Sequence, residues 1–242
     1  MSPHEYPHNI YPALFLFEIK YQLCPILWPD IVDKLPLEKA KKCAFVLHTE
    51  HISDHGTDLD AVIELLANGE QYNIIFTDNR FDPQGMNLLY NSTDAQILLT
   101  SNEGWGLSLT EAILVGNPII ANVTGGMQDQ MRFEDENGEW IKSTEEFGSN
   151  HRGKYKNHGK WAYPVFPSNL SIVGSIPTPY IFDDRVNDNE VADAIMTIYK
   201  WSKKERKKRG LEGRKWAIEN LSSKIMCDKM AEGIETAIKN FK

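Results

Sequence analysis

Apolar residues between positions 43 and 122 follow two alternating patterns. Short continuous apolar runs, typical of strands buried on both faces, alternate with stretches that have helical apolar spacing. Strands are expected at 43–48, 72–77, 95–100 and 118–122, and helices at 57–68, 85–92 and 108–116. Strands that alternate with helices form a parallel sheet with right-handed crossovers, so the pattern predicts an α/β, Rossmann-like sheet flanked by helices. Ligands of such sheets bind outside the carboxyl ends of the strands.

The alternation weakens outside this region. Residues 1–42 hold six of the twelve prolines and show little periodicity, although 14–19 fits a strand or a piece of helix. We therefore expect 1–42 to be a linker-like or partly folded segment, with the domain at 43–242. Residues 131–182 are expected to be an irregular, aromatic-rich insertion. It either packs onto the domain or forms a small β-rich excursion, in which Trp161 or Tyr163 stacks on a ligand.

Two further helices are marked by apolar residues within 191–201 and 218–234. Between them, 203–209 holds six cations in seven positions. Two interpretations are open, a solvated linker between the helices, which we favour, and peripheral contact with an anionic membrane surface.

Length and composition limit the class of protein. The 242 residues suit one α/β domain and are few for two Rossmann lobes. With 41% hydrophobic residues the chain can form a core, while 26 basic against 34 acidic residues give a net charge of −8. Nucleic acid is therefore not an expected partner, because phosphate neutralisation needs a basic surface.

The chain carries few marks of export. No apolar run reaches the length of a membrane span, and the first ten residues are polar and proline-rich rather than a secretory signal. The cysteines at 24, 43 and 227 are too few for a disulfide framework or a zinc site. We expect a cytoplasmic protein.

Two patterns superficially indicate a metal site. His48, His51 and His55 are closely spaced, and Asp58 and Asp60 form a D-x-D sequence. Glycine and threonine after His55 favour a loop, and the two aspartates open an amphipathic helix, where acidic side chains are favourable. We expect no metal there.

The segment 103–126 holds the strongest candidate chemistry. Its glycines lie between an expected strand and an expected helix, a corner where backbone N–H groups and the helix amino end bind anions. Glu103 and Glu111, eight positions apart, supply acceptors suited to sugar hydroxyls. Together they suggest a phosphorylated sugar as ligand.

This segment resembles the donor-binding, C-terminal lobe of retaining GT-B glycosyltransferases of group 1 (family 4-like), which include sucrose synthases and many lipopolysaccharide and mannosyl transferases. The resemblance rests on ordered motifs: LLYNSTDAQILLTSNEGWGLSLTEA at 88–112, Gly116-Asn117-Pro118, the apolar 119–121, and Gly125-Gly126 followed by Asp129.

The resemblance implies a role for each matching residue. Glu103 is expected to contact hydroxyls of the donor hexose and Glu111 the nucleotide ribose. The backbone facing the diphosphate and sugar is expected at Gly104, Trp105, Gly106, Leu107, Gly125 and Gly126. Trp105 stands where phenylalanine is more usual.

One departure concerns the leaving group. Many relatives carry an arginine and a lysine, the latter just before a glycine, in the loop after the first donor-lobe strand. With 43–48 taken as that strand, His55 before Gly56 takes the lysine position and no arginine is present. An imidazole of ordinary pKa, about 6.5, is mostly neutral at pH 7. Either His55 is protonated on donor binding, or Arg80, Arg132 or another cation compensates, or the donor binds poorly.

The resemblance implies transfer of a hexose from a UDP-, GDP- or ADP-sugar to an acceptor hydroxyl with retention, without metal or other cofactor. Glu103 and His55 are the candidate catalytic residues. Alternatives are a non-catalytic nucleotide-sugar-binding lobe of a split glycosyltransferase, and a phosphorylase or epimerase on the same fold. On this resemblance, 1–42 is at most a remnant of an acceptor lobe, so a partner lobe or self-association is expected.

Overall fold

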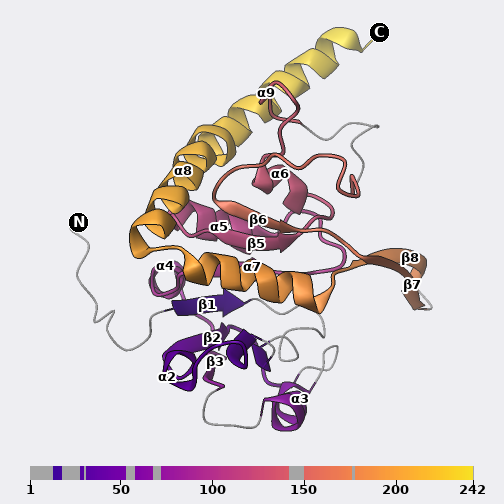
Figure 1. Cartoon of the computed structure of the whole chain (residues 1–242). Helices are drawn as coiled ribbons and strands as arrows, with labels where there is room; N and C mark the ends of the chain where they lie inside the picture. Colours follow the sequence, from indigo (N-terminus) through magenta and orange to yellow (C-terminus); the bar gives the residue numbers. More distant parts are fainter. Residues whose placement is uncertain are drawn as a thin grey trace.

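The computed structural model describes residues 13–17, 28–29, 31–52, 58–67, 72–141, 150–175 and 178–241. Within them, a parallel six-stranded sheet has the order β3-β2-β1-β4-β5-β6 (Figure 1). Its strands are β1 (Ala13–Phe17), β2 (Cys43–Leu47), β3 (Ile74–Phe76), β4 (Ala95–Leu98), β5 (Ile119–Asn122) and β6 (Ala162–Val165). An antiparallel hairpin, β7 (Asn169–Ser175) and β8 (Thr178–Arg185), projects from the body (Figure 1).

The described helices are α2 (Leu37–Ala40), α3 (Leu59–Leu66), α4 (Pro83–Asn91), α5 (Leu107–Val115), α6 (Met127–Met131), α7 (Asp188–Lys200), α8 (Lys203–Leu221) and α9 (Ser223–Asn240). Every strand and helix expected between 43 and 122 is present, with ends shifted by a few residues. This confirms the predicted fold class, a Rossmann-like parallel sheet flanked by helices. None of the described helices is long and apolar enough to cross a membrane.

Two apolar cores lie on opposite faces of the sheet. One joins the strands to α7 and to residues near Trp28, and the other joins them to α4, α5 and α8. Successive residues of β5 serve both, because Ile120 belongs to the first core and Ile119 to the second. A strand covered on both sides needs apolar residues at every position, which explains the continuous apolar runs.

The sheet extends further toward the amino end than the sequence suggested. β1 lies between β2 and β4, and Trp28, Ile31 and Val32 are buried in the first core. The domain boundary expected at residue 43 therefore falls inside the sheet. Among the described residues, the strand at 43–47 is preceded by another strand and is not the first.

The expected insertion at 131–182 contributes β6 to the main sheet. β6 includes Pro164, which a strand at the sheet edge tolerates because proline lacks a backbone donor. Trp161 is buried and stacks on Trp216 of α8 at 5.0 Å between ring centroids. Packing onto the domain, rather than stacking on a ligand, is therefore confirmed for Trp161.

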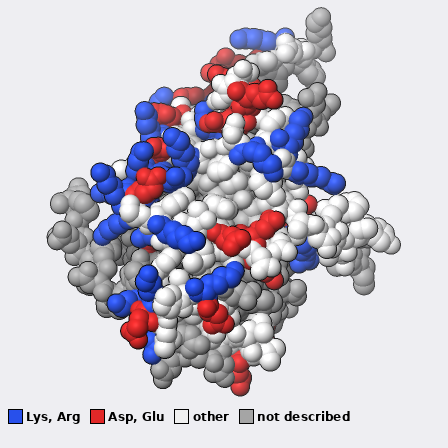
Figure 2. All heavy atoms as spheres, viewed as in Figure 1, with Lys and Arg blue, Asp and Glu red and all other residues white. Residues whose placement is uncertain are grey.

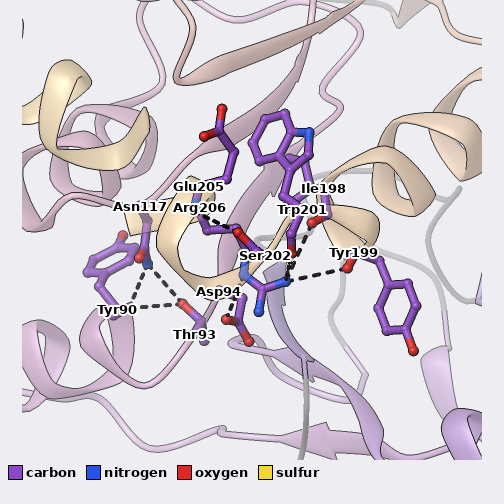
Figure 3. A network of polar contacts seen from close by, with 10 residues as sticks. All are labelled: Tyr90, Thr93, Asp94, Asn117, Ile198, Tyr199, Trp201, Ser202, Glu205 and Arg206. Atoms are coloured by element: carbon purple, nitrogen blue, oxygen red, sulfur yellow. Dashed lines mark hydrogen bonds and ion pairs between the residues drawn. The ribbon is translucent and has the colours of Figure 1, made fainter. Parts of the chain in front are cut away.

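The basic run 203–209 is the first part of α8, so the favoured interpretation as a linker was wrong. Ser202 caps the helix by accepting a hydrogen bond from the Glu205 N–H at 3.1 Å. Arg206 points back into the molecule, where its guanidinium pairs with Asp94 at 3.2 Å and donates to carbonyls at the end of α7 (Figure 3). Close packing continues at Gly210, which lies against the backbone of Gly116 at the end of α5.

Candidate functional site

Two glycine-containing loops meet at the carboxyl ends of the neighbouring strands β4 and β5. The Gly126 N–H donates to the Glu103 carbonyl at 3.3 Å. A Cβ added at Gly125 would lie 1.9 Å from the Glu103 carbonyl oxygen, and one at Gly126 would lie 2.1 Å from the Gly104 carbonyl oxygen. Only glycine allows this approach, so the sequence motif at 125–126 is explained by contact with the loop at 103–104.

The amino end of α5 begins in the same loop. Gly106 precedes the helix with a φ of +79°, a left-handed conformation that suits glycine. Gly106 supplies no capping side chain, and the side chain of Leu107 is exposed. The first-turn N–H groups and the positive end of the helix dipole therefore make this corner favourable for an anion.

A partly buried hydrogen-bonded chain of side chains holds the glycine loop. The Trp105 indole N–H donates to Thr110 Oγ1 at 2.9 Å, and that hydroxyl donates to Gln130 Oε1 at 2.7 Å. The Gln130 amide in turn donates to the backbone carbonyls of Trp105 and Gly106. Gln130 is fully buried in α6, so it connects the loops after β4 and β5. The sequence analysis did not identify Thr110 or Gln130.

The two glutamates differ in their surroundings. Glu111 is exposed on α5, and Tyr90 of α4 donates its hydroxyl to Glu111 Oε2 at 2.8 Å. This contact orients the carboxylate and leaves Oε1 as a further acceptor site. Glu103 is partly exposed, and its Oε1 accepts a long hydrogen bond of 3.4 Å from the Trp105 N–H. Glu103 is thus held within the glycine loop, and Glu111 is held against α4 about one helical turn into α5.

The root of the β7–β8 hairpin also joins this corner. Asp184 Oδ2 accepts from the Thr124 hydroxyl at 2.8 Å, and the Asp184 N–H donates to the Ser101 carbonyl at 2.9 Å. The Asn122 amide donates to the carbonyls of both Thr100 and Asp184, each at 3.0 Å. These contacts fix the loops after β4 and β5 relative to the hairpin. Nothing in the local sequence pattern around Asp184 signalled them.

Only some of the cations expected to neutralise the leaving diphosphate lie in the described part of the chain. His55 lies outside the described residues, and its loop follows the second strand of the sheet. The residues that follow the first strand, 18–27, also lie outside the described part and include Lys20. Arg80 is exposed, while Arg132 forms an ion pair with Glu134.

The described members of the expected histidine and aspartate patterns have other contacts. His48 Nδ1 lies 2.9 Å from Thr77 Oγ1, and His51 Nδ1 lies 2.8 Å from Asp60 Oδ1. Asp58 caps α3 by accepting from the Ala61 N–H at 3.0 Å, as expected for a first-turn acid. Among the described residues, no group of three or more His, Cys, Asp or Glu side chains could hold a metal ion.

Two other features of the described residues are a partly buried acid and a hollow. Asp129 follows the glycine pair, and burial raises the pKa of its carboxyl. An open hollow of about 580 Å³ runs along β6 and α7 and is lined by residues including His158, Tyr163 and Glu190, but by none of the predicted donor-binding residues.

Comparison with known proteins defines the class. Residues 52–148 match the family model for glycosyl transferases group 1. No curated protein sequence gives a significant match to the chain. The fold resembles sucrose-phosphate synthase from Thermosynechococcus elongatus, with a TM-score of 0.60 and 13% identity over 98% of this chain and 47% of that one. HepE from Anabaena, solved in complex with UDP and glucose, gives a TM-score of 0.57 and 12% identity. The match covers 93% of this chain and 49% of that one.

The C-terminal domain of a group 1 glycosyltransferase, LpcC from Francisella tularensis, gives a TM-score of 0.53 and 16% identity, covering 88% of this chain and 87% of that one. The chain thus has the Rossmann-like fold of one GT-B lobe and spans about half the length of HepE and sucrose-phosphate synthase. Its segment 52–148 matches the family model of the group 1 glycosyltransferases, the family that the motifs resemble.

Proposed function

We propose that this chain binds a nucleoside-diphosphate sugar at the carboxyl ends of β4 and β5, as the donor lobe of a glycosyltransferase. The observation that carries the proposal is the contact of Gly125 and Gly126 with the backbone of Glu103 and Gly104, beside the amino end of α5. HepE, a structural neighbour, has been solved in complexes with UDP and glucose and with UDP-glucose, which supports this choice of ligand.

In this proposal, each group acts on a different part of the donor. The amino end of α5 and the 104–107 backbone hold the diphosphate, Glu111 accepts from ribose hydroxyls, and Glu103 accepts from the hexose. As the bond between the hexose and the diphosphate breaks, negative charge grows on the leaving group. Fixed N–H dipoles stabilise that charge without reorganising, and the hexose passes to an acceptor hydroxyl with retention.

The two glutamates give a test by calorimetric titration with UDP, GDP and ADP and with their sugars. Glu111→Ala should weaken both free nucleotide and sugar nucleotide by roughly 1.5 to 3 kcal/mol, the range for hydrogen bonds to a charged group. Glu103→Ala should weaken only the sugar nucleotide. Glu136→Ala, an exposed glutamate away from the glycine loop, is the matched control and should bind normally.

Equal losses for both ligands in the Glu103 variant would contradict its assigned role. Because backbone amides need no cation to hold a diphosphate, binding should also survive excess EDTA. Binding that disappears on chelation and returns with Mg²⁺ or Mn²⁺ would instead favour a metal-dependent site.

A second candidate is a donor lobe that is inactive without another lobe. The chain spans about half the length of its full-length structural neighbours, and no side chain of α9 is buried. Exposed apolar residues recur along α9 at Met226, Met230, Ile234 and Ile238. An uncovered apolar stripe of this kind favours association with a partner or a second copy.

Sedimentation of the chain, together with a transfer assay, distinguishes the two candidates. If a second lobe is needed, the chain should bind a sugar nucleotide, transfer it slowly, and self-associate. Met230→Ser combined with Ile234→Ser should then restore a monomer without changing nucleotide binding. Efficient transfer by a monomer would instead show that this chain includes an acceptor site.

A further inference from the structure

We propose that the exposed face of α8 rests on an anionic lipid surface. The buried side of this helix consists mainly of small residues and one tryptophan: Gly210, Gly213, Trp216 and Ala217. Cations are concentrated on the opposite, exposed side: Lys203, Lys204, Lys207, Lys208, Arg214 and Lys215. Figure 2 shows Lys and Arg side chains gathered along the side of the molecule where Figure 1 places α8.

This face differs from the basic run in the sequence, because two cations of the run are used inside the protein. Arg206 pairs with Asp94 and the end of α7. Arg209 pairs with Glu205 at 2.7 Å and stacks over the Trp201 ring at 4.2 Å. Arg206 through these contacts, and Arg209 through a hydrogen bond of 3.3 Å to the Lys160 carbonyl, hold α8 against the body. The remaining cations are therefore displayed on a fixed helix rather than on a flexible tail.

Two exposed apolar residues lie within the cationic face. Leu211 is 50% exposed and Ile218 is 48% exposed. At a turn of about 100° per residue, Lys204, Leu211, Lys215 and Ile218 project to the same side of α8. Lysine and arginine positions therefore flank Leu211 on both sides along the helix, and Arg214 and Lys215 lie one turn before Ile218.

Charge separates this face from the rest of the chain. α8 carries eight lysines and arginines against three glutamates, whereas the whole chain has a net charge of −8. One glutamate, Glu205, is held by Arg209, which lowers the pKa of Glu205. By helical spacing, Glu212 and Glu219 lie toward one edge of the exposed face and Arg214 toward the other. Neighbouring segments add the exposed Lys160 and Lys200.

The combination favours a lipid surface over other anionic partners. An interfacial helix places apolar side chains at the boundary between headgroups and acyl chains, while flanking lysines extend to the headgroup phosphates. A nucleic acid backbone has no apolar layer that would receive Leu211 and Ile218. Such a helix lies along the membrane and does not cross it, in keeping with the polar character of α8.

Vesicle flotation with the whole chain tests the proposal without any assay of transfer. Phosphatidylcholine vesicles containing phosphatidylglycerol should carry the protein upward, vesicles of phosphatidylcholine alone should not, and added salt should weaken binding. A lysine close to an anionic surface contributes about fivefold to partitioning, so the triple variant Lys204→Ala, Lys208→Ala, Lys215→Ala should bind roughly a hundredfold more weakly.

Two further variants complete the test. Lys34→Ala, Lys39→Ala, Lys42→Ala removes the same charge from exposed positions on and beside α2 and should bind nearly as the wild type. Leu211→Ser with Ile218→Ser should reduce binding at unchanged charge. The proposal is overturned if the two triple variants behave alike, if the serine variant binds normally, or if the wild type prefers an RNA or DNA duplex to the charged vesicles.

Discussion

At residue scale, the site depends on how closely two loops approach each other. Gly126 has a φ of −69°, which any residue can adopt, so its backbone conformation does not require glycine. Glycine is required at 126 because a side chain would have no room. The Gly104 carbonyl oxygen occupies the position that a side chain at 126 would need. Gly104 itself has open space where a Cβ would lie. The two glycines in contact therefore have opposite tolerance for a methyl group.

We predict that Gly126→Ala lowers the free energy of unfolding by about 1 to 3 kcal/mol or more, because the added Cβ forces the two loops apart. The same displacement should weaken nucleotide binding. Gly104→Ala, the matched control, should cost less than about 1 kcal/mol. Urea unfolding and calorimetry measure both effects. Similar losses of stability in the two variants would show that the loops are not packed in this way.

The sequence predicted the glycines and glutamates of the corner but not the side chains that hold them. Glycine and acid spacing is a local signal, since each motif lies at a single strand-to-helix turn. The Trp105, Thr110 and Gln130 contacts join positions on different elements. A polar residue inside a helix gives no sign of which distant carbonyl it will meet. Such partners emerge only when α5 and α6 are placed side by side.

At the scale of elements, α8 packs on α5 through glycine. A Cβ added at Gly210 would lie 1.7 Å from the carbonyl oxygen of Gly116. The buried face built from glycine and alanine leaves almost no apolar periodicity in the sequence. This explains why a long helix was mistaken for a charged linker, although lysine, arginine and glutamate are good helix formers.

Two glycines within helices should respond oppositely to alanine. Gly210→Ala should destabilise the protein, by about 1 to 3 kcal/mol or more, because the added methyl group meets backbone. Gly233→Ala in α9 meets nothing within 4 Å and should stabilise by about 0.5 to 1 kcal/mol through helix propensity. Thermal or urea unfolding gives the sign of each change. Stabilisation by both substitutions would exclude the close packing of α8 on α5.

The strands differ in how well the sequence indicated them. β2, β3, β4 and β5 each adjoin a clear helical pattern and were predicted. β1 reads ALFLF, a short apolar run without periodicity that fits either a strand or a helix. β6 contains proline within an irregular region, and only its place at the sheet edge makes that residue acceptable. Pairing with neighbouring strands therefore determines that both segments form strands.

At the scale of the whole molecule, a buried histidine links stability to pH. His151 lies among Phe133, Tyr155 and Phe166, with ring centroids 4.4, 5.5 and 5.7 Å away. Burial, helped by nearby Lys156, lowers the pKa of His151 from 6.5 to about 4. Burial also lowers the pKa of His158. The folded protein therefore binds these protons less tightly than the unfolded chain does.

Stability from His151 should be complete above pH 6.5 and should fall as pH decreases toward about 4, where the folded form also takes up the proton. The loss over this window is at most about 3 kcal/mol. His151→Gln should flatten the pH dependence of the free energy of unfolding, measured by urea titration. The control is His51→Gln, in the segment after β2, which should retain the wild-type slope. Equal slopes in the two variants would rule out this role for His151.

The central place of β1 determines when the sheet can close during synthesis. Residues 13–17 leave the ribosome well before β4, yet Phe15 pairs with Ala95 of that strand. Until then, one edge of an apolar strand stays available for wrong pairing, and nascent chains of this kind are prone to aggregate. Completion of β4 is thus the step that commits the growing chain to its native topology, and slow translation just before it prolongs the need for a chaperone.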